Sequence, residues 1–194
     1  MAKLFFRYGA MNCGKSTALM QVAHNYEERG LKVLVLKPKI DTKADNKISS
    51  RIGLEREVDH LISDDEDVYE YIKDKKVDCV IIDEAQFLRP EQIDQLLLVV
   101  VLEDIPVICY GLRTDFQTKG FPGSTRLLEI AHSIEEMKTI CRCGAKAMFN
   151  ARKVNDTFVF DGEQVAIDGK DEVTYESLCG KCYYKEKNKI LIKK

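Results

Sequence analysis

The stretch GAMNCGKST, from Gly9 to Thr17, has residue types and spacing that suit phosphate binding. Two glycines, Gly9 and Gly14, allow the backbone to wrap a phosphate with its N–H groups. Lys15 can reach the β- and γ-phosphates of a nucleotide, and Ser16 can ligate Mg²⁺. The stretch therefore predicts a nucleoside triphosphate site, but it does not say which group accepts the phosphate.

A second candidate is the segment CVIIDEAQF, in which an apolar run ends at Asp83. A carboxylate at the end of a buried strand can hold Mg²⁺ in a nucleotide site, directly or through water. Glu84 follows at once, and side chains alternate along a strand, so one carboxylate can face the metal and the other the acceptor. Glu84 is thus the candidate general base, a role worth roughly 10²–10⁴-fold in rate. In the alternative interpretation, Glu84 activates water in an ATPase or caps the following segment.

Four of the seven cysteines form two close pairs, in the segments CRC and CGKC. Four thiolates in two pairs can complete a closed tetrahedral zinc site, which has no open position for catalysis. The alternative is a set of free or redox-active thiols. We therefore predict a structural zinc site whose ligands are Cys141, Cys143, Cys179 and Cys182.

Composition narrows the class of protein. The formal net charge is −2 and the pI is about 6.0, which argues against a nucleic-acid binder that works by bulk electrostatics. No signal peptide precedes the glycine loop. The longest apolar run, Leu96 to Leu102, is too short to cross a bilayer. We expect a cytoplasmic protein with reduced thiols and no membrane partner.

Apolar patterning supplies the elements that must position these residues. Buried strands are expected where short apolar runs end at a glycine or turn, and helices where apolar residues recur at helical spacing. Residues 39–60 are polar and poorly periodic, which predicts a mobile loop. Strands and helices alternate, which predicts an α/β fold with a parallel sheet flanked by helices. The predicted strands are 3–8, 32–38, 77–84 and 106–111, and the predicted helices are 15–29, one starting at the Ser63–Glu66 capping box, and 90–102.

The pattern changes after about residue 138, where cysteine pairs and short Val, Phe and Ile segments replace the strand–helix alternation. We expect a P-loop domain over 1–138 and a small β-rich, zinc-binding domain over 139–194. The lysine-rich tail from Tyr183 is expected to be a solvated end.

Taken together, GAMNCGKST, DEAQF, YGLRTDF and the paired cysteines resemble the type II thymidine kinases over about residues 3–185. The resemblance implies transfer of the γ-phosphate of ATP, with Mg²⁺, to the 5′-hydroxyl of thymidine or deoxyuridine. It implies a RecA-like α/β domain and a small zinc domain bearing a loop, the lasso, that encloses the base. Members are commonly homotetramers or dimers.

The resemblance also assigns roles by position. Glu84 takes the place of the general base. Arg152 corresponds to a residue that clamps phosphate. The ATP site corresponds to Gly9, Ala10, Met11, Asn12, Cys13, Gly14, Lys15 and Ser16, with Asp83 and Gln86; Ser16 and Asp83 would hold magnesium. The nucleoside site corresponds to Phe116, Phe121, Gln164, Val165, Ala166, Ile167, Asp168 and Tyr175.

The chain departs from the family pattern at a few positions. Cys13 stands where a serine is frequent, and Lys43 where an arginine is frequent; the lasso reads Ile167-Asp168-Gly169 in place of Ile-Gly-Gly. A second function class stays open at this point, a nucleic-acid-associated ATPase with a zinc ribbon. The net charge and the lack of a dense basic–aromatic stripe disfavour it.

Overall fold

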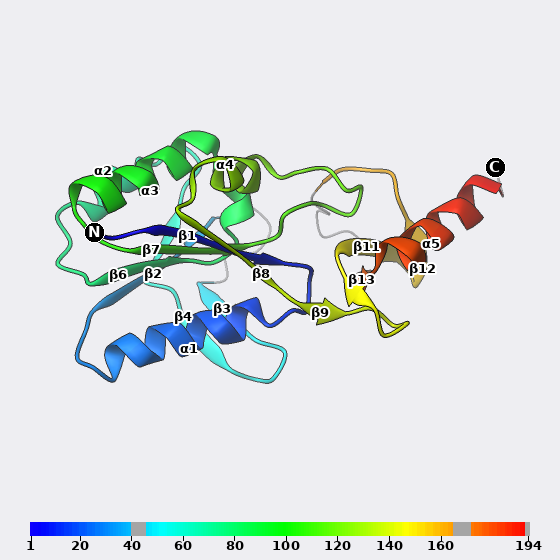
Figure 1. The fold of residues 1–194 in the computed structure, drawn as a ribbon, viewed down its shortest axis with the longest axis horizontal. Helices are drawn as coiled ribbons and strands as arrows, with labels where there is room; N and C mark the ends of the chain where they lie inside the picture. The colour runs from blue at the N-terminus through cyan, green and yellow to red at the C-terminus, as the bar shows by residue number, and fades with distance from the viewer. Residues whose placement is uncertain (40–45, 165–171, 193–194) are drawn as a thin grey trace.

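The computed structural model describes residues 1–39, 46–164 and 172–192, with side chains up to residue 189. Its centre is a six-stranded parallel sheet in the order β5-β2-β6-β7-β1-β8 (Figure 1). The four inner strands are mostly apolar on both faces, as expected where helices cover a sheet on both sides. The bounds are β1 (Leu4–Gly9), β2 (Val33–Pro38), β5 (His60–Ile62), β6 (Cys79–Ile82), β7 (Val107–Gly111) and β8 (Ser133–Met137).

Helices cover the two faces of this sheet unequally. Helix α1 (Lys15–Glu27) packs on one face, where Leu19, Met20 and Ala23 join the inward residues of the strands. Three helices cover the other face (Figure 1). They are α2 (Val68–Ile72), α3 (Pro90–Leu102) and α4 (Pro122–Ile130).

The carboxyl ends of the parallel strands meet along one edge of the sheet. At this edge β1 runs into the Gly9–Thr17 loop, and β6 runs into Asp83 and the 3₁₀ turn η1 (Ala85–Phe87). Strand β7 lies between β1 and β6 in the sheet. The sheet therefore brings the glycine loop and the acidic pair, about 70 residues apart in sequence, to one edge.

The rest of the chain forms a smaller β-rich part around the cysteines. Its core contains Ala151, Phe160, Leu178 and the fully buried Tyr183, together with Cys141 and Cys179. It lies at the end of the molecule that carries the C-terminus (Figure 1). The elements are β9 (Thr139–Ile140), β10 (Lys146–Ala147), β11 (Phe149–Val154), β12 (Thr157–Val159), β13 (Val173–Leu178) and α5 (Gly180–Ile192).

The predicted α/β class is confirmed: a parallel sheet flanked by helices, with a cysteine-bearing β-rich part after it. Each of the four predicted strands is present, and the helix predicted over 90–102 is α3, with Pro90 in its first turn. The domain boundary at residue 138 stays a prediction.

The prediction of a loop over 39–60 is wrong for the part that the structure describes. Strands β3 (Lys47–Ser49) and β4 (Glu55–Glu57) pair as an antiparallel hairpin. Ile48 in β3 is buried against the α1 face of the sheet, and Arg56 in β4 forms a bidentate ion pair with Glu27 of α1. A single buried residue in a polar strand leaves almost no apolar pattern, which explains the error. Residues 40–45, including Lys43, lie outside the described residues.

Two predictions, one of a helix start and one of the tail, need correction. The Ser63–Glu66 box forms only a turn, in which the Glu66 carboxylate accepts the Ser63 N–H; α2 begins at Val68 with Asp67 as its cap. The tail forms helix α5, which begins at Gly180 and buries Tyr183, whereas the described side chains from Tyr184 to Lys189 are exposed or half-buried. The many lysines of the tail favoured a solvated end, and they gave no sign that one tyrosine of the tail would be buried.

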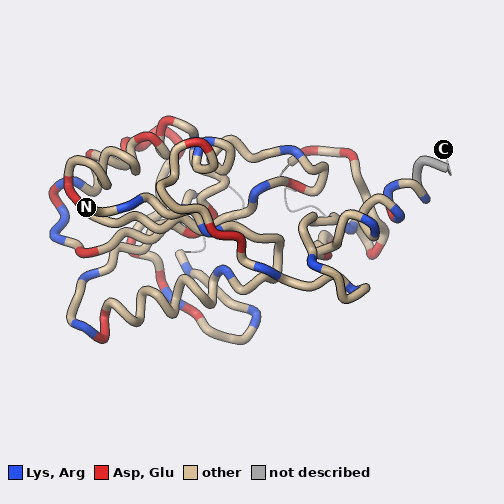
Figure 2. Tube along the Cα trace, viewed as in Figure 1, with Lys and Arg blue, Asp and Glu red and all other residues tan. Residues whose placement is uncertain are grey.

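Charges of both signs are interspersed along the trace, and lysines recur on α5 (Figure 2). None of the helices in the described part of the chain is long and apolar enough to cross a membrane.

Candidate active site

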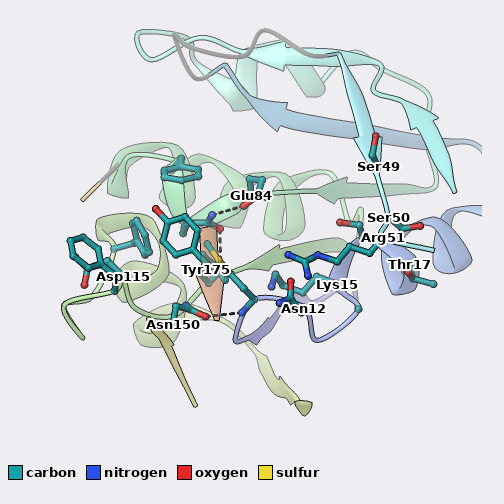
Figure 3. Close-up of a pocket in the computed structure, with 18 of the residues that line it drawn as sticks. Asn12, Lys15, Thr17, Ser49, Ser50, Arg51, Glu84, Asp115, Asn150 and Tyr175 are labelled. Atoms are coloured by element: carbon teal, nitrogen blue, oxygen red, sulfur yellow. Dashed lines mark hydrogen bonds between the residues drawn. The ribbon is translucent and has the colours of Figure 1, made fainter. Parts of the chain in front are cut away.

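A cavity of about 610 Å³ opens at the carboxyl edge of the sheet. Its size is ordinary for a small-molecule site. Figure 3 shows Lys15 and Arg51 on one side of it and Asp115 and Tyr175 on the other, with Glu84 between them. The lining residues are Met11, Asn12, Gly14, Lys15, Ser16, Thr17, Ser49, Ser50, Arg51, Ile52, Glu84, Gln86, Phe87, Leu112, Asp115, Phe116, Phe121, Asn150, Gln164, Val173 and Tyr175.

The glycine loop has the backbone geometry that its sequence predicts. Gly14 has φ +85°, a left-handed conformation that favours glycine, and α1 starts at the next residue. Gly9 is needed for close packing, since a Cβ there would lie 2.4 Å from the Cys13 Sγ and 2.5 Å from the Met137 carbonyl oxygen. The Lys15 ammonium donates a hydrogen bond to the Ala10 carbonyl oxygen at 3.1 Å. A phosphate would meet a preformed loop.

Glu84 lies in the cavity and is held by a short chain of hydrogen bonds. Its backbone has φ +51°, so the strand geometry ends before it and the residue turns into η1. The Gln86 amide nitrogen donates to the Glu84 carboxylate at 2.5 Å, and the Gln86 amide oxygen accepts the Leu112 N–H at 3.0 Å. Gln86 is 1% exposed, so this amide fixes the Glu84 carboxylate against the end of β7. Gly111 leaves room for Gln86, since a Cβ there would lie 2.8 Å from its amide oxygen.

Asp83 is buried at the end of β6 rather than exposed in the cavity. Burial raises the pKa of Asp83 to about 7, and the neighbouring Glu84 carboxylate adds to the increase, whereas Lys37 and Lys15 oppose it. In its deprotonated form, Asp83 offers carboxylate oxygens, which are ligands that Mg²⁺ accepts. Asp83 and Glu84 differ in exposure to the cavity, because of the two only Glu84 lines it.

Aromatic and basic side chains form the other side of the cavity. Phe116 is 1% exposed, and the Arg152 guanidinium lies 3.7 Å from its ring centroid. Arg152 donates to the Tyr175 hydroxyl at 3.0 Å and to the Glu163 and Gln164 carbonyl oxygens at 2.8 Å each. Arg152 is itself buried and does not line the cavity. Its donors hold the start of the 163–175 segment in place.

Two further contacts shape this side. The Asp115 carboxylate accepts the backbone N–H groups of Gln117 and Lys119 and the Gln164 side-chain amide at 3.1 Å. Phe121 packs edge-on against Phe87, with ring centroids 5.5 Å apart. The predicted substrate residues Val165, Ala166, Ile167 and Asp168 lie outside the described residues.

A pair of polar residues ties the glycine loop to the β-rich part. Asn150 accepts the Met11 N–H at 2.8 Å (Figure 3). Asn150 also donates to the Thr114 carbonyl oxygen at 3.3 Å. The Ser177 hydroxyl donates to the Met11 carbonyl oxygen. Sequence reasoning missed both residues, because a single Asn or Ser within a strand carries no local signal. The Asp115 turn has a signal, in the run TDFQTKG, that indicates a polar turn.

The four paired cysteines converge as predicted. Their four sulfur atoms all lie within 4.8 Å of one another, in Cys141, Cys143, Cys179 and Cys182. The Cys143 and Cys179 sulfurs are 3.6 Å apart. Zn–S bonds of about 2.3 Å in a tetrahedron place sulfurs roughly 3.8 Å apart, so the donor set fits zinc. The remaining cysteines lie elsewhere: burial raises the pKa of Cys79 to about 11 and also raises that of Cys109, as expected for inert thiols in strands.

The comparisons with known proteins agree with this arrangement. A family model described as thymidine kinase matches residues 2–183. The chain belongs to the thymidine kinase family. Among its relatives, the thymidine kinase of Enterobacteria phage T4 is 49% identical over 187 residues, which cover 93% of this chain and 95% of that protein. The thymidine kinases of Ruegeria pomeroyi and Photorhabdus laumondii are each 47% identical; the matches cover 93% and 94% of this chain and 93% and 92% of those proteins.

Most of the site residues predicted from the resemblance to thymidine kinases lie in one cavity. Glu84, Gln86, Phe116, Phe121, Gln164 and Tyr175 line it together with Met11, Asn12, Gly14, Lys15 and Ser16. Gly9, Ala10, Cys13, Asp83 and Arg152 support it from outside the lining. The hairpin residues 49–52 were missed, because nothing in the sequence marks a polar hairpin as part of this cavity.

Proposed function

We propose that the chain transfers the γ-phosphate of ATP to the 5′-hydroxyl of thymidine or deoxyuridine, giving the nucleoside 5′-monophosphate. The observation that carries the proposal is the position of Glu84. It lies in one cavity between Lys15 of the glycine loop on one side and Tyr175 on the other (Figure 3), and Ser16 and Phe116 line the same cavity.

The residues divide the chemistry in a simple way. The glycine-loop N–H groups and Lys15 bind the phosphates, and positive charge around the moving phosphoryl group lowers the barrier. Glu84 takes the proton of the attacking 5′-hydroxyl onto its carboxylate, and Gln86 keeps that carboxylate oriented. Ser16 and Asp83 would hold Mg²⁺, which when bound shields the phosphate charges.

The acceptor is a nucleoside rather than water because the cavity offers a flat apolar surface. A pyrimidine needs such a slot with a few main-chain hydrogen bonds. The buried rings of Phe116 and Phe121 supply the slot, and Gln164 lines the same cavity. A site that only hydrolysed ATP would have no use for these aromatic walls beside the base.

We also propose that Cys141, Cys143, Cys179 and Cys182 hold one structural zinc ion. The sulfur positions support this, and the cluster joins the turn after β9 to the start of α5. The expected homotetramer or dimer, the cytoplasmic location and the domain boundary at residue 138 stay predictions from the sequence.

The test is an assay with ATP, Mg²⁺ and thymidine that measures ADP and thymidine 5′-monophosphate separately. We expect the two products in equal amounts, and almost no ADP when thymidine is left out. ADP release that ignores thymidine, or that single-stranded DNA stimulates instead, contradicts the proposal. A panel of pyrimidine nucleosides in the same assay resolves thymidine from deoxyuridine.

A further inference from the structure

We propose that Asn150 and Ser177 are positioning residues for the phosphate loop, through which the β-rich part sets the geometry of the ATP side of the site. The inference rests on the proposed function and adds a role that the glycine-loop motif does not contain. Its basis is a pair of hydrogen bonds that hold both polar groups of one loop residue, Met11.

The first bond orients the peptide between Ala10 and Met11. A trans peptide is planar, so the Met11 N–H and the Ala10 C=O point in opposite directions. Asn150 accepts that N–H at 2.8 Å, which directs the Ala10 carbonyl to the other side. There the carbonyl oxygen accepts the Lys15 ammonium at 3.1 Å. Asn150 thereby fixes the resting position of the lysine that is to meet the β- and γ-phosphates.

The second bond orients the next peptide, between Met11 and Asn12. The Ser177 hydroxyl donates to the Met11 carbonyl oxygen, so the N–H of Asn12 must point away from Ser177. Asn12 lines the cavity and has φ +65°, a left-handed conformation that is uncommon for a residue other than glycine. The hydrogen bond to Ser177 helps to hold this conformation, in which the loop N–H groups can face a phosphate.

The two positioning residues form one unit. Asn150 on β11 and Ser177 on β13 lie directly opposite each other in the antiparallel ladder. Both are buried, with exposures of 3% and 8%, so water competes little for their hydrogen bonds. Asn150 is further fixed by its bond to the Thr114 carbonyl oxygen.

The same face of the ladder also serves the acceptor side. The next pair on this face, two residues along each strand, is Arg152 opposite Tyr175, and these side chains are hydrogen-bonded. One ladder face thus contacts the phosphate loop through Asn150 and Ser177 and the nucleoside side through Arg152 and Tyr175. Because Ser177 does not line the cavity, its removal acts on the nucleoside only indirectly.

The test compares three variants on the two strand faces. Ser177→Ala removes the donor to the loop, Ser177→Thr keeps a hydroxyl, and Thr174→Ala removes an exposed hydroxyl from the same strand. We expect Ser177→Ala to raise the KM for ATP about tenfold, because it leaves a carbonyl group without its partner, with the KM for thymidine changed less than about twofold. Ser177→Thr and Thr174→Ala should stay close to the unmodified protein in both KM values.

A binding measurement makes the test independent of turnover. The rise in Tm that a fixed concentration of MgATP produces reports its affinity, and the rise with thymidine reports the other site. In Ser177→Ala the ATP-induced rise should shrink while the thymidine-induced rise persists. Equal changes for both ligands, or a lower Tm with both KM values unchanged, overturn the proposal. Failure of the unmodified protein to form thymidine 5′-monophosphate would instead overturn the proposed function, whatever the variants do.

Discussion

Under the proposed function, the site has a donor half, the Gly9–Thr17 loop with Asp83 and Glu84, and an acceptor half, formed by Phe116, Arg152, Gln164 and Tyr175. The donor half follows the ends of two strands of one parallel sheet, and its residues lie in two short runs of sequence. The acceptor half combines the loop after β7 with three segments of the β-rich part. Its geometry depends on side-chain hydrogen bonds such as those of Arg152.

This difference predicts how substitutions affect each half of the site. A run of adjacent residues on a sheet edge is positioned by backbone, so a single side chain there changes chemistry more than shape. A set of residues drawn from distant segments is positioned by buried contacts, so single substitutions there change shape first. Four substitutions test this contrast, beginning with the largest expected effect on free energy.

The zinc cluster should matter most, because its four cysteines join separate segments of the β-rich part that carries most of the acceptor half. Cys179→Ser removes one of four ligands, and apparent zinc-binding free energies of roughly 10–16 kcal/mol in small peptides exceed what so small a core supplies. We expect metal content to fall from about one zinc per chain, and Tm to fall by roughly 10 °C or more. Elemental analysis and calorimetry measure both. The control, Cys13→Ser, changes a cysteine outside the cluster and should keep its zinc; a metal-free protein with full activity refutes the claim.

Glu84→Gln should affect chemistry alone. It keeps the size of the side chain and removes the base, so kcat should fall roughly 10²–10⁴-fold. ATP binding, measured by titration, should remain close to that of the unmodified protein. The matched control is Glu91→Gln in the first turn of α3, which lies outside the cavity lining and should leave kcat unchanged. Near-normal turnover by Glu84→Gln would exclude Glu84 as the base.

Arg152→Lys tests two different roles for one buried cation. Lysine keeps the charge but cannot make the three bonds that Arg152 makes to Tyr175, Glu163 and Gln164. If Arg152 holds the acceptor half, the KM for thymidine should rise roughly 10- to 100-fold and the KM for ATP should change little. A phosphate clamp predicts a fall in kcat with an unchanged KM for thymidine. Lys153→Met, on the opposite strand face, is the control.

Tyr183→Phe should have the smallest effect. It removes the hydroxyl that donates to the Phe116 carbonyl oxygen at 2.5 Å, a contact between α5 and the acceptor half. The expected loss is about 1 kcal/mol, or about 2–4 °C in Tm for a chain of this size. Tyr184→Phe, at an exposed position on the same helix, should change nothing. An equal loss in both variants would mean that the bond to Phe116 does not stabilise the fold.

The strands that the sequence predicted are the four inner strands of the sheet, β1, β2, β6 and β7. Inner strands are buried on both faces and read as continuous apolar runs. The two edge strands were missed for the opposite reason: β5 has three residues, and β8 contains the exposed Glu135. Short and charged edges hinder pairing with other chains, and the same traits hide them from pattern analysis.

The site divides in the same way. The glycine loop and the Asp83–Glu84 pair were legible because spacing along the chain fixes their geometry. The bond from Gln86 to Leu112 and the Asn150–Ser177 pair were not, because each depends on which strands become neighbours. The phosphate-clamp role assigned to Arg152 stays a prediction, and its contacts with the Glu163 and Gln164 carbonyl groups required the structure.

The hydrogen bonds of Met11 also say something about the order of synthesis. Its partners, Asn150 and Ser177, come 139 and 166 residues later in the chain. Because a ribosome releases the N-terminus first, the phosphate loop is made early and waits for nearly the whole polypeptide before both its peptide planes are held. A truncated product that stops before β13 would carry every residue of the nucleotide motif without the hydroxyl that orients it.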